Sequence, residues 1–277
     1  MKPQIILTLI TIFISGFFLS AQSYQALEDQ DNLEFAWPEG KKMALSLTFD
    51  DARLSQADTG IPLFDRYDVK ATFYISPESM LERLDIWKEA VENGHDIGNH
   101  SMVHPCSGNF QWSRSRALEN YTLNDMETEL DSASRFIKEY LGVYPVSFAY
   151  PCGQTFVGRG INTKSYVPLV ASMFDSGRGW LDEGPNDPGF TDMAQLRGVE
   201  LDGKSFDQIL PLIEEAKSSG GWLILAGHEI GSGGRQTSLT ETIEEILQYA
   251  TDPANGIWID NVGNIASFVI EARPAGF

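Results

Sequence analysis

The chain of 277 residues is 42% hydrophobic and 21% charged, so it can bury a sizeable core, and global disorder is excluded. Its 20 Lys and Arg stand against 39 Asp and Glu, and the net charge of −19 argues against nucleic acid and anionic lipid as partners. Two cysteines exclude a disulfide-dense scaffold and a four-cysteine zinc site but allow one bridge, so a metal would be held by His, Asp or Glu.

The first 21 residues have the pattern of a secretory signal peptide. Lys2 precedes an apolar stretch over residues 5–19, and small residues end at Ala21, where we expect cleavage. An uncleaved anchor is the alternative, although a membrane span needs about 20 apolar residues. The sequence thus predicts a signal peptide over 1–21, a lead-in over 22–41, one folded domain over 42–277 without a membrane span, and a secreted or periplasmic location.

Short apolar runs then alternate with segments of helical period, which predicts an α/β domain built from parallel βα units. Strands are expected over 43–49, 70–75, 96–98, 146–149, 169–173, 222–226 and 256–259. Helices are expected over 61–67, 86–93, 123–141, 205–219 and 238–249. Two long loops, 105–121 and 176–198, are rich in Gly, Ser, Asn, Pro and aromatic residues, and loops of that length usually serve binding.

Two adjacent carboxylates, Asp50 and Asp51, follow the first expected strand. Successive side chains of a strand point to opposite sides, so both can reach one site only where the strand ends and turns. Active sites of α/β proteins lie at that end of the sheet. A helix cap is the alternative, since Asp is favoured there as well.

His100 and His104 follow the short strand that ends near Gly98. A separation of four residues places both imidazoles on one face of a helical turn, close enough to chelate one divalent ion. With Asp51 as third ligand, the set would leave positions open for water, as catalytic sites do. Two loop histidines without a metal are the alternative. His95, at the entry to the same strand, is expected to be a hydrogen-bonded structural residue.

A continuous apolar run over 221–227 predicts a fully buried parallel strand, and His228 stands at its end. The glycine-rich segment 231–234 lacks the Lys-Ser or Lys-Thr of a phosphate loop. We therefore expect a flexible active-site loop there and no nucleotide binding.

Three motifs in this order resemble those of the polysaccharide deacetylases, the family-four carbohydrate esterases. They are Thr48-Phe49-Asp50-Asp51, His100-Ser101-x-x-His104 and Leu223-x-Leu225-x-x-His228, and the resemblance covers roughly residues 42–267. It implies a distorted (β/α) barrel of about seven parallel strands, with the active site at their carboxyl ends. It also implies that Asp51, His100 and His104 hold a metal, that Asp50 is the general base and that His228 is the general acid.

The third family motif is matched only in part, by Phe148-Ala149-Tyr150-Pro151-Cys152-Gly153. Ala149 stands where the family has an arginine that orients the base, so either another cation such as Arg178 replaces it or Asp50 is less well held. The resemblance assigns the backbone N–H of Cys152 to the oxyanion. A loose match to the fourth motif assigns Asp175 to tuning of the catalytic histidine.

The same resemblance places both cysteines beside the metal, where we expect a disulfide between Cys106 and Cys152; two free buried thiols are the alternative. Tyr150, Pro151, Trp112 and Trp180 are expected to contact the sugar, because aromatic faces stack on sugar rings.

The sequence therefore predicts an exported, metal-dependent deacetylase that hydrolyses O- or N-linked acetyl groups of an acetylated polysaccharide or oligosaccharide. Zn²⁺ is the expected ion, with Co²⁺ as the alternative. Two other functions remain open: a carbohydrate-binding protein with impaired catalysis, suggested by Ala149, and a metal-dependent amidase acting on a non-sugar C–N bond. The acidic surface favours neutral glycans.

Overall fold

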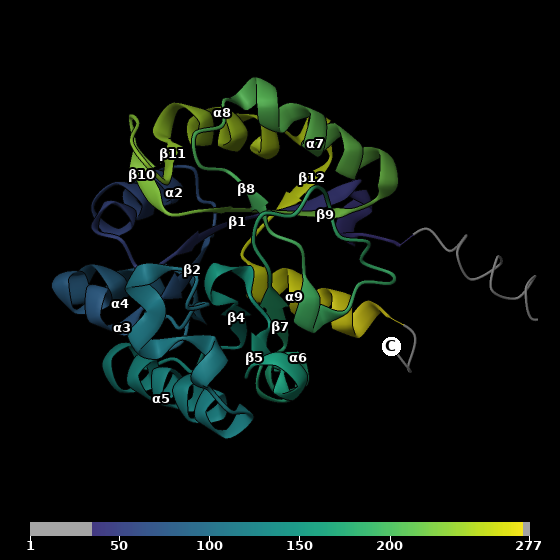
Figure 1. Cartoon of the computed structure of the whole chain (residues 1–277). Coiled ribbons are helices and arrows are strands. Elements are labelled where there is room, and N and C mark those ends of the chain that lie inside the picture. Colours follow the sequence, from purple (N-terminus) through teal and green to yellow (C-terminus); the bar gives the residue numbers. More distant parts are fainter. Residues whose placement is uncertain (1–34, 274–277) are drawn as a thin grey trace, which may run out of the picture. The chain divides into compact units, whose positions relative to one another are not determined.

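A sheet of parallel strands, curled into a half-barrel, forms the centre of the computed structural model, which describes residues 35–273 (Figure 1). Seven of its eight strands follow one another in the order β7 (Ser176–Arg178), β4 (Ser147–Ala149), β3 (Asp96–Asn99), β2 (Thr72–Ile75), β1 (Met43–Asp50), β9 (Trp222–Gly227) and β8 (Val199–Glu200), and the eighth pairs with β1 beside this row. This arrangement confirms the predicted distorted (β/α) barrel of about seven parallel strands.

The central strand, β1, changes its neighbour along its length. Its first residues pair with β12 (Ile257–Ile259), and its last three, up to Asp50, pair with β2. On its other side β9 follows it from Ala44 to Phe49. Because all these pairs are parallel, the carboxyl ends of β1, β2 and β9 lie at one edge of the sheet.

The outer strands approach each other through the chain that leads into β8. Leu196 forms a parallel bridge with Arg178 of β7, and three residues later Val199 pairs with Leu225 of β9. The sheet therefore curls far enough for one short segment to contact strands near both of its edges.

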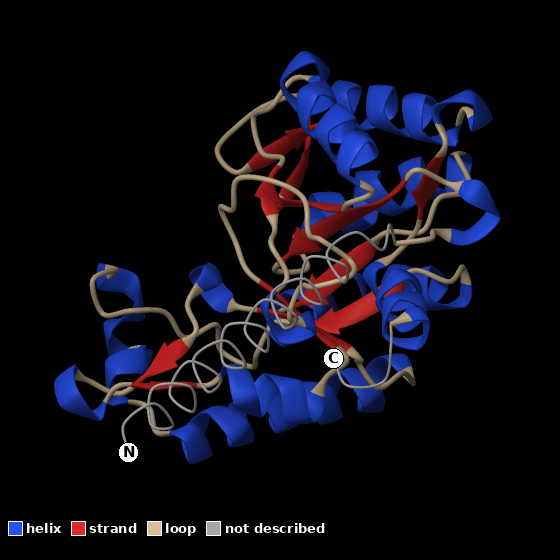
Figure 2. Cartoon of the chain, turned by 90° about the vertical axis from the view of Figure 1, so that its right-hand side faces the viewer, coloured by secondary structure: helices blue, strands red, loops and turns tan. Residues whose placement is uncertain are grey.

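Helices cover the outside of the sheet in both views (Figures 1 and 2). They are α2 (Ile61–Arg66), α3 (Pro77–Met80), α4 (Leu84–Glu92), α5 (Leu123–Leu141), α6 (Val167–Met173), α7 (Phe206–Ser219), α8 (Thr240–Thr251) and α9 (Val262–Ala272). The longest, α5, begins at a capping box between Thr122 and Asp125 and ends at Gly142, whose φ of 77° suits a residue without a side chain.

Two short pairs complete the fold. β5 (Phe156–Val157) pairs with β6 (Lys164–Ser165), and β10 (Glu229–Gly231) pairs with β11 (Thr237–Leu239). The second pair directly follows His228 and flanks the glycine-rich segment 231–234, of which only Gly231 belongs to a strand.

One predicted strand is wrong. Residues 169–173 belong to helix α6, which begins with Pro168 in its first turn, and a short apolar run cannot by itself distinguish a buried strand from a buried helix. The strand that occupies this place in the sheet is β7, inside the predicted loop 176–198. Its sequence, Ser-Gly-Arg, carries no apolar pattern.

From Trp37 onward, the residues that the structure describes form one compact unit, which contains all the elements named above. The predicted signal peptide, 1–21, and most of the lead-in lie outside the described residues. Every helix within residues 35–273 is too short or too polar to cross a bilayer.

Candidate active site

A cavity of about 570 Å³ opens at the carboxyl ends of β1, β3 and β9, a size usual for small-ligand sites. It is lined by Asp50, Asp51, Arg53, His100, His104, Phe110, Trp112, Arg116, Tyr150, Cys152, Trp180, Leu181, His228, Arg235 and Gln236. We call Phe110, Trp112, Arg116 and Arg235 the rim. We call Asp50–Arg178 and His228–Asp202 the buried pairs.

The backbone after β1 turns sharply enough to bring two neighbouring carboxylates to the cavity. The strand ends at Asp50, and the next two residues, Asp51 and Ala52, have φ values of 77° and 52°. Residues with side chains rarely adopt such values, and they persist where the surroundings enforce them. Here Gln56 helps to hold the turn, because its Nε2 donates to the carbonyl oxygens of Asp50, at 2.6 Å, and His228, at 2.8 Å.

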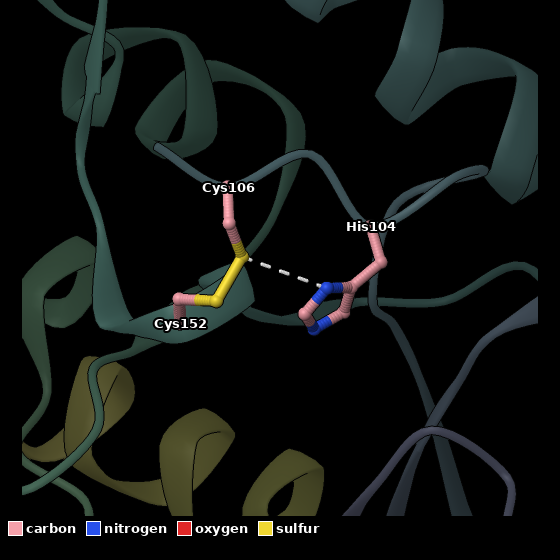
Figure 3. Close-up of side chains that lie close together, drawn as sticks. All are labelled: His104, Cys106 and Cys152. Carbon is pink, nitrogen blue, oxygen red and sulfur yellow. Dashed lines mark hydrogen bonds between the residues drawn. A yellow bond between two sulfur atoms is a disulfide. The ribbon is translucent and has the colours of Figure 1, made fainter. Parts of the chain in front are cut away.

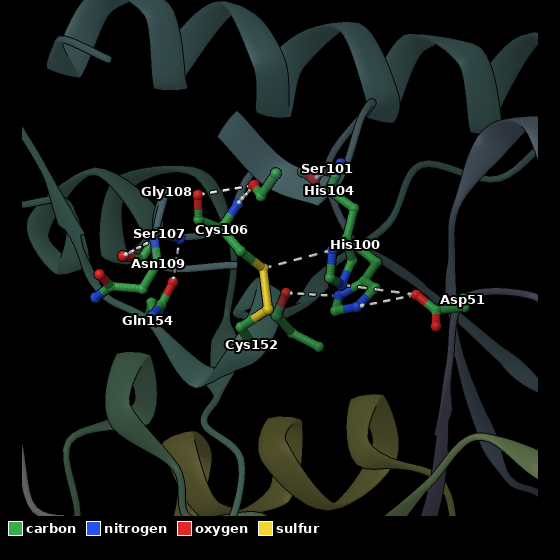
Figure 4. The surroundings of a disulfide bond; sticks show 12 residues. Asp51, His100, Ser101, His104, Cys106, Ser107, Gly108, Asn109, Cys152 and Gln154 are labelled. Atoms are coloured by element: carbon green, nitrogen blue, oxygen red, sulfur yellow. Dashed lines mark hydrogen bonds and ion pairs between the residues drawn. A yellow bond between two sulfur atoms is a disulfide. The ribbon is translucent and has the colours of Figure 1, made fainter. Parts of the chain in front are cut away.

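Asp51, His100 and His104 place three ligand atoms within 4.8 Å of one another. The Nε2 atoms of His100 and His104 lie 3.6 and 3.7 Å from Oδ1 of Asp51, and both rings face that carboxylate (Figure 4). Ligands bound tetrahedrally to one zinc ion lie about 3.3 Å apart, so small shifts would close this set around a divalent cation.

The two histidines converge by a route that differs from the predicted helical turn. Residues 100–104 form a loop in which Ser101 and His104 have φ values of 63° and 53°. The loop is held by Asn99, whose Oδ1 accepts from the N–H of Ser101, and by Ser101, whose Oγ accepts from the N–H of His104. The two imidazoles therefore converge because of left-handed backbone conformations and not because the residues lie one helical turn apart.

The second ring nitrogen of each histidine is already engaged. Nδ1 of His100 lies 2.9 Å from the carbonyl oxygen of Ala149, to which it donates, and Nδ1 of His104 lies 3.6 Å from Sγ of Cys106. Both contacts favour the tautomer that leaves Nε2 free for a metal. Arg53 donates to Oδ2 of Asp51 at 2.9 Å and leaves Oδ1 toward the imidazoles.

The electrostatics of this set also suit a metal. Burial, together with the neighbouring His100, lowers the pKa of His104 to about 4, so its imidazole is neutral at neutral pH. Burial alone would raise the pKa of Asp51, but His100, His104 and Arg53 outweigh it and lower that pKa to about 2. A neutral imidazole and an ionised carboxylate are the forms that bind metals.

Asp50 forms a buried ion pair with Nη2 of Arg178. Arg178 also donates to the carbonyl oxygen of Gly179, and its guanidinium lies 4.9 Å from the centre of the Tyr74 ring. In the sheet register Arg178 of β7 is the direct partner of Ala149 of β4. The guanidinium therefore comes from the strand next to the position where the family resemblance expects an arginine.

The pair fixes the protonation state of Asp50. Burial alone would raise the pKa of this carboxyl, but Arg178, His100 and His228 together lower it below its ordinary value. Asp50 is thus ionised at neutral pH and ready to accept a proton.

His228, directly after β9, pairs with Asp202. Its Nδ1 lies 2.7 Å from Oδ2 of Asp202, whose Oδ1 accepts from the backbone N–H of His228 at 3.1 Å and from Ser238 at 2.8 Å. The indole of Trp180 meets the imidazole edge-on, with ring centres 4.9 Å apart. Burial lowers the pKa of His228, but Asp202, Asp50 and Asp51 outweigh it, so the pKa lies above its ordinary value.

The assignment of Asp175 to this role is wrong. Asp175 is exposed and precedes β7, so it lies at the opposite end of the strand from Arg178. The residue beside His228 is Asp202, which follows β8. The alternation Val199-Glu200-Leu201-Asp202, an apolar-polar strand pattern ending in a carboxylate, is the signal that could have found it.

Cys106 and Cys152 form a disulfide beside His104, with Cα atoms 6.1 Å apart (Figure 3). It joins the histidine loop to the turn that contains Cys152, and Gln154 adds a hydrogen bond from the N–H of Ser107 to its own Oε1, at 2.7 Å (Figure 4). The sulfurs lie close to His104 but, being bonded to each other, are not thiolate ligands.

The four residues predicted to contact the sugar differ in their access to the cavity. Trp112 is 52% exposed and lies on the rim, and Trp180 lines the cavity beside His228. Tyr150 reaches the cavity but is buried, and its hydroxyl donates to the carbonyl oxygen of Ala194. Pro151 is buried and does not line the cavity, so its contact with the sugar stays a prediction.

Other residues of the site carry no signal in the sequence. Arg53 and Gln56 follow the carboxylate pair without a motif of their own. Arg116 lies in the long loop 105–121 and Arg235 directly after the glycine-rich segment, and only the fold shows that they line one cavity. His95 has the predicted structural role, since its Nδ1 accepts from the N–H of Ala71.

Comparison with known families and proteins gives a consistent match. The family model described as polysaccharide deacetylase matches residues 38–177. Peptidoglycan-N-acetylglucosamine deacetylase PgdA of Listeria monocytogenes is 26% identical over 133 residues, which are 48% of this chain and 26% of that protein. The chain spans about a quarter of the length of such curated relatives.

Solved structures show the same fold. A Mycobacterium smegmatis protein assigned as a polysaccharide deacetylase aligns with a TM-score of 0.59 and 16% identity, over 85% of this chain and 92% of its own. A family 4 acetyl xylan esterase from Clostridium thermocellum, in complex with a cobalt ion, aligns with a TM-score of 0.53 and 18% identity, over 83% and 93% of the two chains.

Proposed function

Because the chain belongs to the polysaccharide deacetylase family, we propose that it is a metal-dependent hydrolase that removes acetyl groups from a glycan. The observation that carries this proposal is the convergence, in one cavity, of the Asp51, His100 and His104 cluster with a buried carboxylate and a buried imidazole. Such a set matches the needs of acyl hydrolysis: a cation site, a base and an acid.

Asp51, His100 and His104 would hold the cation, since their free atoms converge and their protonation states suit it. A divalent ion bound there would polarise the acetyl carbonyl and lower the pKa of water. Two imidazoles and one carboxylate fit Zn²⁺, with Co²⁺ as the alternative.

Asp50 is the general base in this proposal, because it is ionised, faces the cavity and does not belong to the ligand set. His228 is the general acid. Asp202 holds its Nδ1–H, which leaves Nε2 as the nitrogen that protonates the departing sugar oxygen or nitrogen.

The oxyanion would be stabilised by the backbone N–H of Cys152. Cys152 lines the cavity with a φ of 55°, and the disulfide ties its turn to the loop that carries His104. A donor fixed in this way need not reorganise as charge develops, which is the condition for strong transition-state stabilisation.

We also place the protein outside the cytoplasm. The signal-peptide pattern of residues 1–21 and a disulfide between loops of the site both support an oxidising compartment. The substrate would be an acetylated polysaccharide or oligosaccharide, with the acetyl group on oxygen or nitrogen.

The test is acetate release from O-acetylated xylan, chitooligosaccharides and peptidoglycan fragments. We expect turnover on at least one of these glycans, its loss with a chelator, and its recovery with zinc or cobalt. The variant His104→Ala should lose the bound metal, whereas His95→Ala, which changes a histidine outside the cavity, should keep it. Turnover that survives complete metal removal would contradict the mechanism.

The alternative of a binding protein with impaired catalysis depends on Ala149. The ion pair between Arg178 and Asp50 weakens that argument. Arg178 provides beside Asp50 the cation that the family has at the position of Ala149. Tight glycan binding without acetate release from any of these glycans would favour the alternative.

A further inference from the structure

The active-site cavity gathers positive charge in a strongly acidic protein. The chain has only 20 Lys and Arg against 39 Asp and Glu, yet Arg53, Arg116 and Arg235 all line this cavity. They come from three separate segments of the chain, so their meeting at one place is a property of the fold.

Among the described residues, Arg53 is held by carboxylates, and the other two arginines are not. Arg53 pairs with Asp51 and Glu229. Within residues 35–273, neither Arg116 nor Arg235 has an ion-pair partner, and the buried Nε of Arg116 lacks a hydrogen-bond acceptor. The guanidinium of Arg116 lies 5.7 Å from the centre of the exposed Trp112 ring.

These two cations are not needed to balance the catalytic carboxylates. Asp50 is paired with Arg178, and Asp51 with Arg53 and the two imidazoles. A divalent cation would make the site still more positive. A guanidinium matches a carboxylate with two parallel hydrogen bonds, so an arginine without an acceptor beside an active site is suited to an anionic substrate group.

The position of Arg116 sets where that group would lie. Arg116 lines the active-site cavity and also a neighbouring cavity of about 490 Å³, whose lining includes Tyr121 and two carboxylates, Asp125 and Glu129, that form no ion pair with Arg116. A sugar next to the acetylated unit would reach the space between the two cavities. The exposed Trp112 ring, beside the guanidinium, offers that sugar an apolar face.

We propose, on the basis of the proposed function, that the substrate is an acetylated glycan carrying a carboxylate, as uronic acid sugars do, and that Arg116 and Arg235 bind this carboxylate. The net charge of −19 would repel a densely sulfated chain, which favours a glycan with isolated carboxylates. This proposal replaces the expectation of a neutral glycan. The substrate would contact the arginines of the cavity, whose charge differs in sign from the net charge of the chain.

The experiment compares acidic and neutral forms of the same glycan on the zinc-loaded, full-length protein. Acetylated glucuronoxylan oligosaccharides serve as the O-acetyl probe and hyaluronan oligosaccharides as the N-acetyl probe, each beside its carboxyl-reduced form. For the probe that is hydrolysed, we expect kcat/KM to be at least tenfold higher with the acidic form. This preference should shrink as salt rises, because the arginines are on the solvent-exposed side of the site.

The double variant Arg116→Gln/Arg235→Gln should lower kcat/KM for the acidic form to the level of the reduced form. The matched control is Arg135→Gln on α5, which removes a positive charge away from the cavity and should keep the preference. Equal rates of acetate release from acidic and reduced forms in the unmodified protein would overturn the inference while the proposed function stands. Faster turnover of a sulfated oligosaccharide without uronate would overturn the assignment to a carboxylate.

If no probe releases acetate, the proposed function fails, and calorimetry with the non-acetylated oligosaccharides decides the inference separately. Tighter binding of the acidic form, lost in the double variant, would support the arginine site. Equal binding of both forms, or none, would overturn it.

Discussion

The buried pairs and the rim of the cavity differ in whether their charged side chains form ion pairs. Asp50 and Asp202 are each bound to a partner, Arg178 and His228, and the four side chains are at most 10% exposed. On the rim, Arg116 and Arg235 line the same cavity and form no ion pair among the described residues, although the charge of Arg116 acts on the nearby Glu129.

We infer that the buried pairs serve the chemical step and that the rim serves substrate recognition. A buried charge must be paired to be tolerated, and its pairing fixes both geometry and protonation before substrate arrives. An unpaired charge at the surface remains available for substrate. Changes to the buried pairs should therefore lower kcat, and changes to the rim should raise KM or alter specificity.

The largest effect is expected for Asp50→Asn. Asparagine keeps the shape and can still accept from Arg178 but cannot take a proton, so we expect kcat to fall about 1,000-fold, within the range for loss of a general base. Zinc content should be unchanged, because Asp51, His100 and His104 remain. Acetate release and metal analysis of the same sample check both.

Two further variants serve as comparisons for the Asp50→Asn result. Asp51→Asn changes the neighbouring carboxylate and should lose zinc as well as turnover. Trp112→Ala, on the rim, should change KM a few-fold and leave kcat nearly intact. Normal turnover by the Asp50→Asn protein would remove Asp50 from the role of base.

An effect of about 100-fold on kcat is expected for Arg178→Ala. Removing one partner of a buried ion pair leaves Asp50 unpaired, which raises its pKa and destabilises the fold by about 3–5 kcal/mol. Thermal unfolding and kcat of the zinc-loaded variant measure the two consequences.

A second variant keeps this prediction testable where the first fails to fold. Ala149 and Arg178 are register partners on adjacent strands, so the exchange Ala149→Arg/Arg178→Ala returns a guanidinium to the neighbourhood of Asp50. We expect this exchange to recover much of the lost activity. A well-folded Arg178→Ala protein with full turnover would show that Asp50 needs no such partner.

Much of the site could be predicted because its residues stand at the ends of clear strands. Asp50 ends the largely apolar β1, Asp51 follows it, and His228 follows the apolar β9, so recognition of these strands alone brings the three residues to one edge of the sheet. His100 and His104 could be predicted from the family motif that contains them, although the backbone that joins them is a loop with left-handed residues.

The rest depends on strands that are too short to be recognised in the sequence. β7 has three residues, Ser-Gly-Arg, and β8 has two, so neither stands out from the loops around it. Arg178 and Asp202 owe their positions to these strands, and Asp202 was missed for this reason. The register that makes Arg178 the neighbour of Ala149 is a property of the assembled sheet.

The smallest expected effect on the buried pairs is a shift in pH dependence, in the variant Asp202→Asn. Asp202 helps to raise the pKa of His228, and a general acid is active below its pKa, so activity is lost as pH rises through that value. Without the carboxylate the pKa falls, so the alkaline limb of the kcat/KM profile should move to lower pH and kcat at neutral pH should decrease. Asp175→Asn is the matched control, because Asp175 is an exposed aspartate before β7 and should leave the profile unchanged. An unmoved alkaline limb in the Asp202→Asn protein would mean that the titrating acid is a group other than His228.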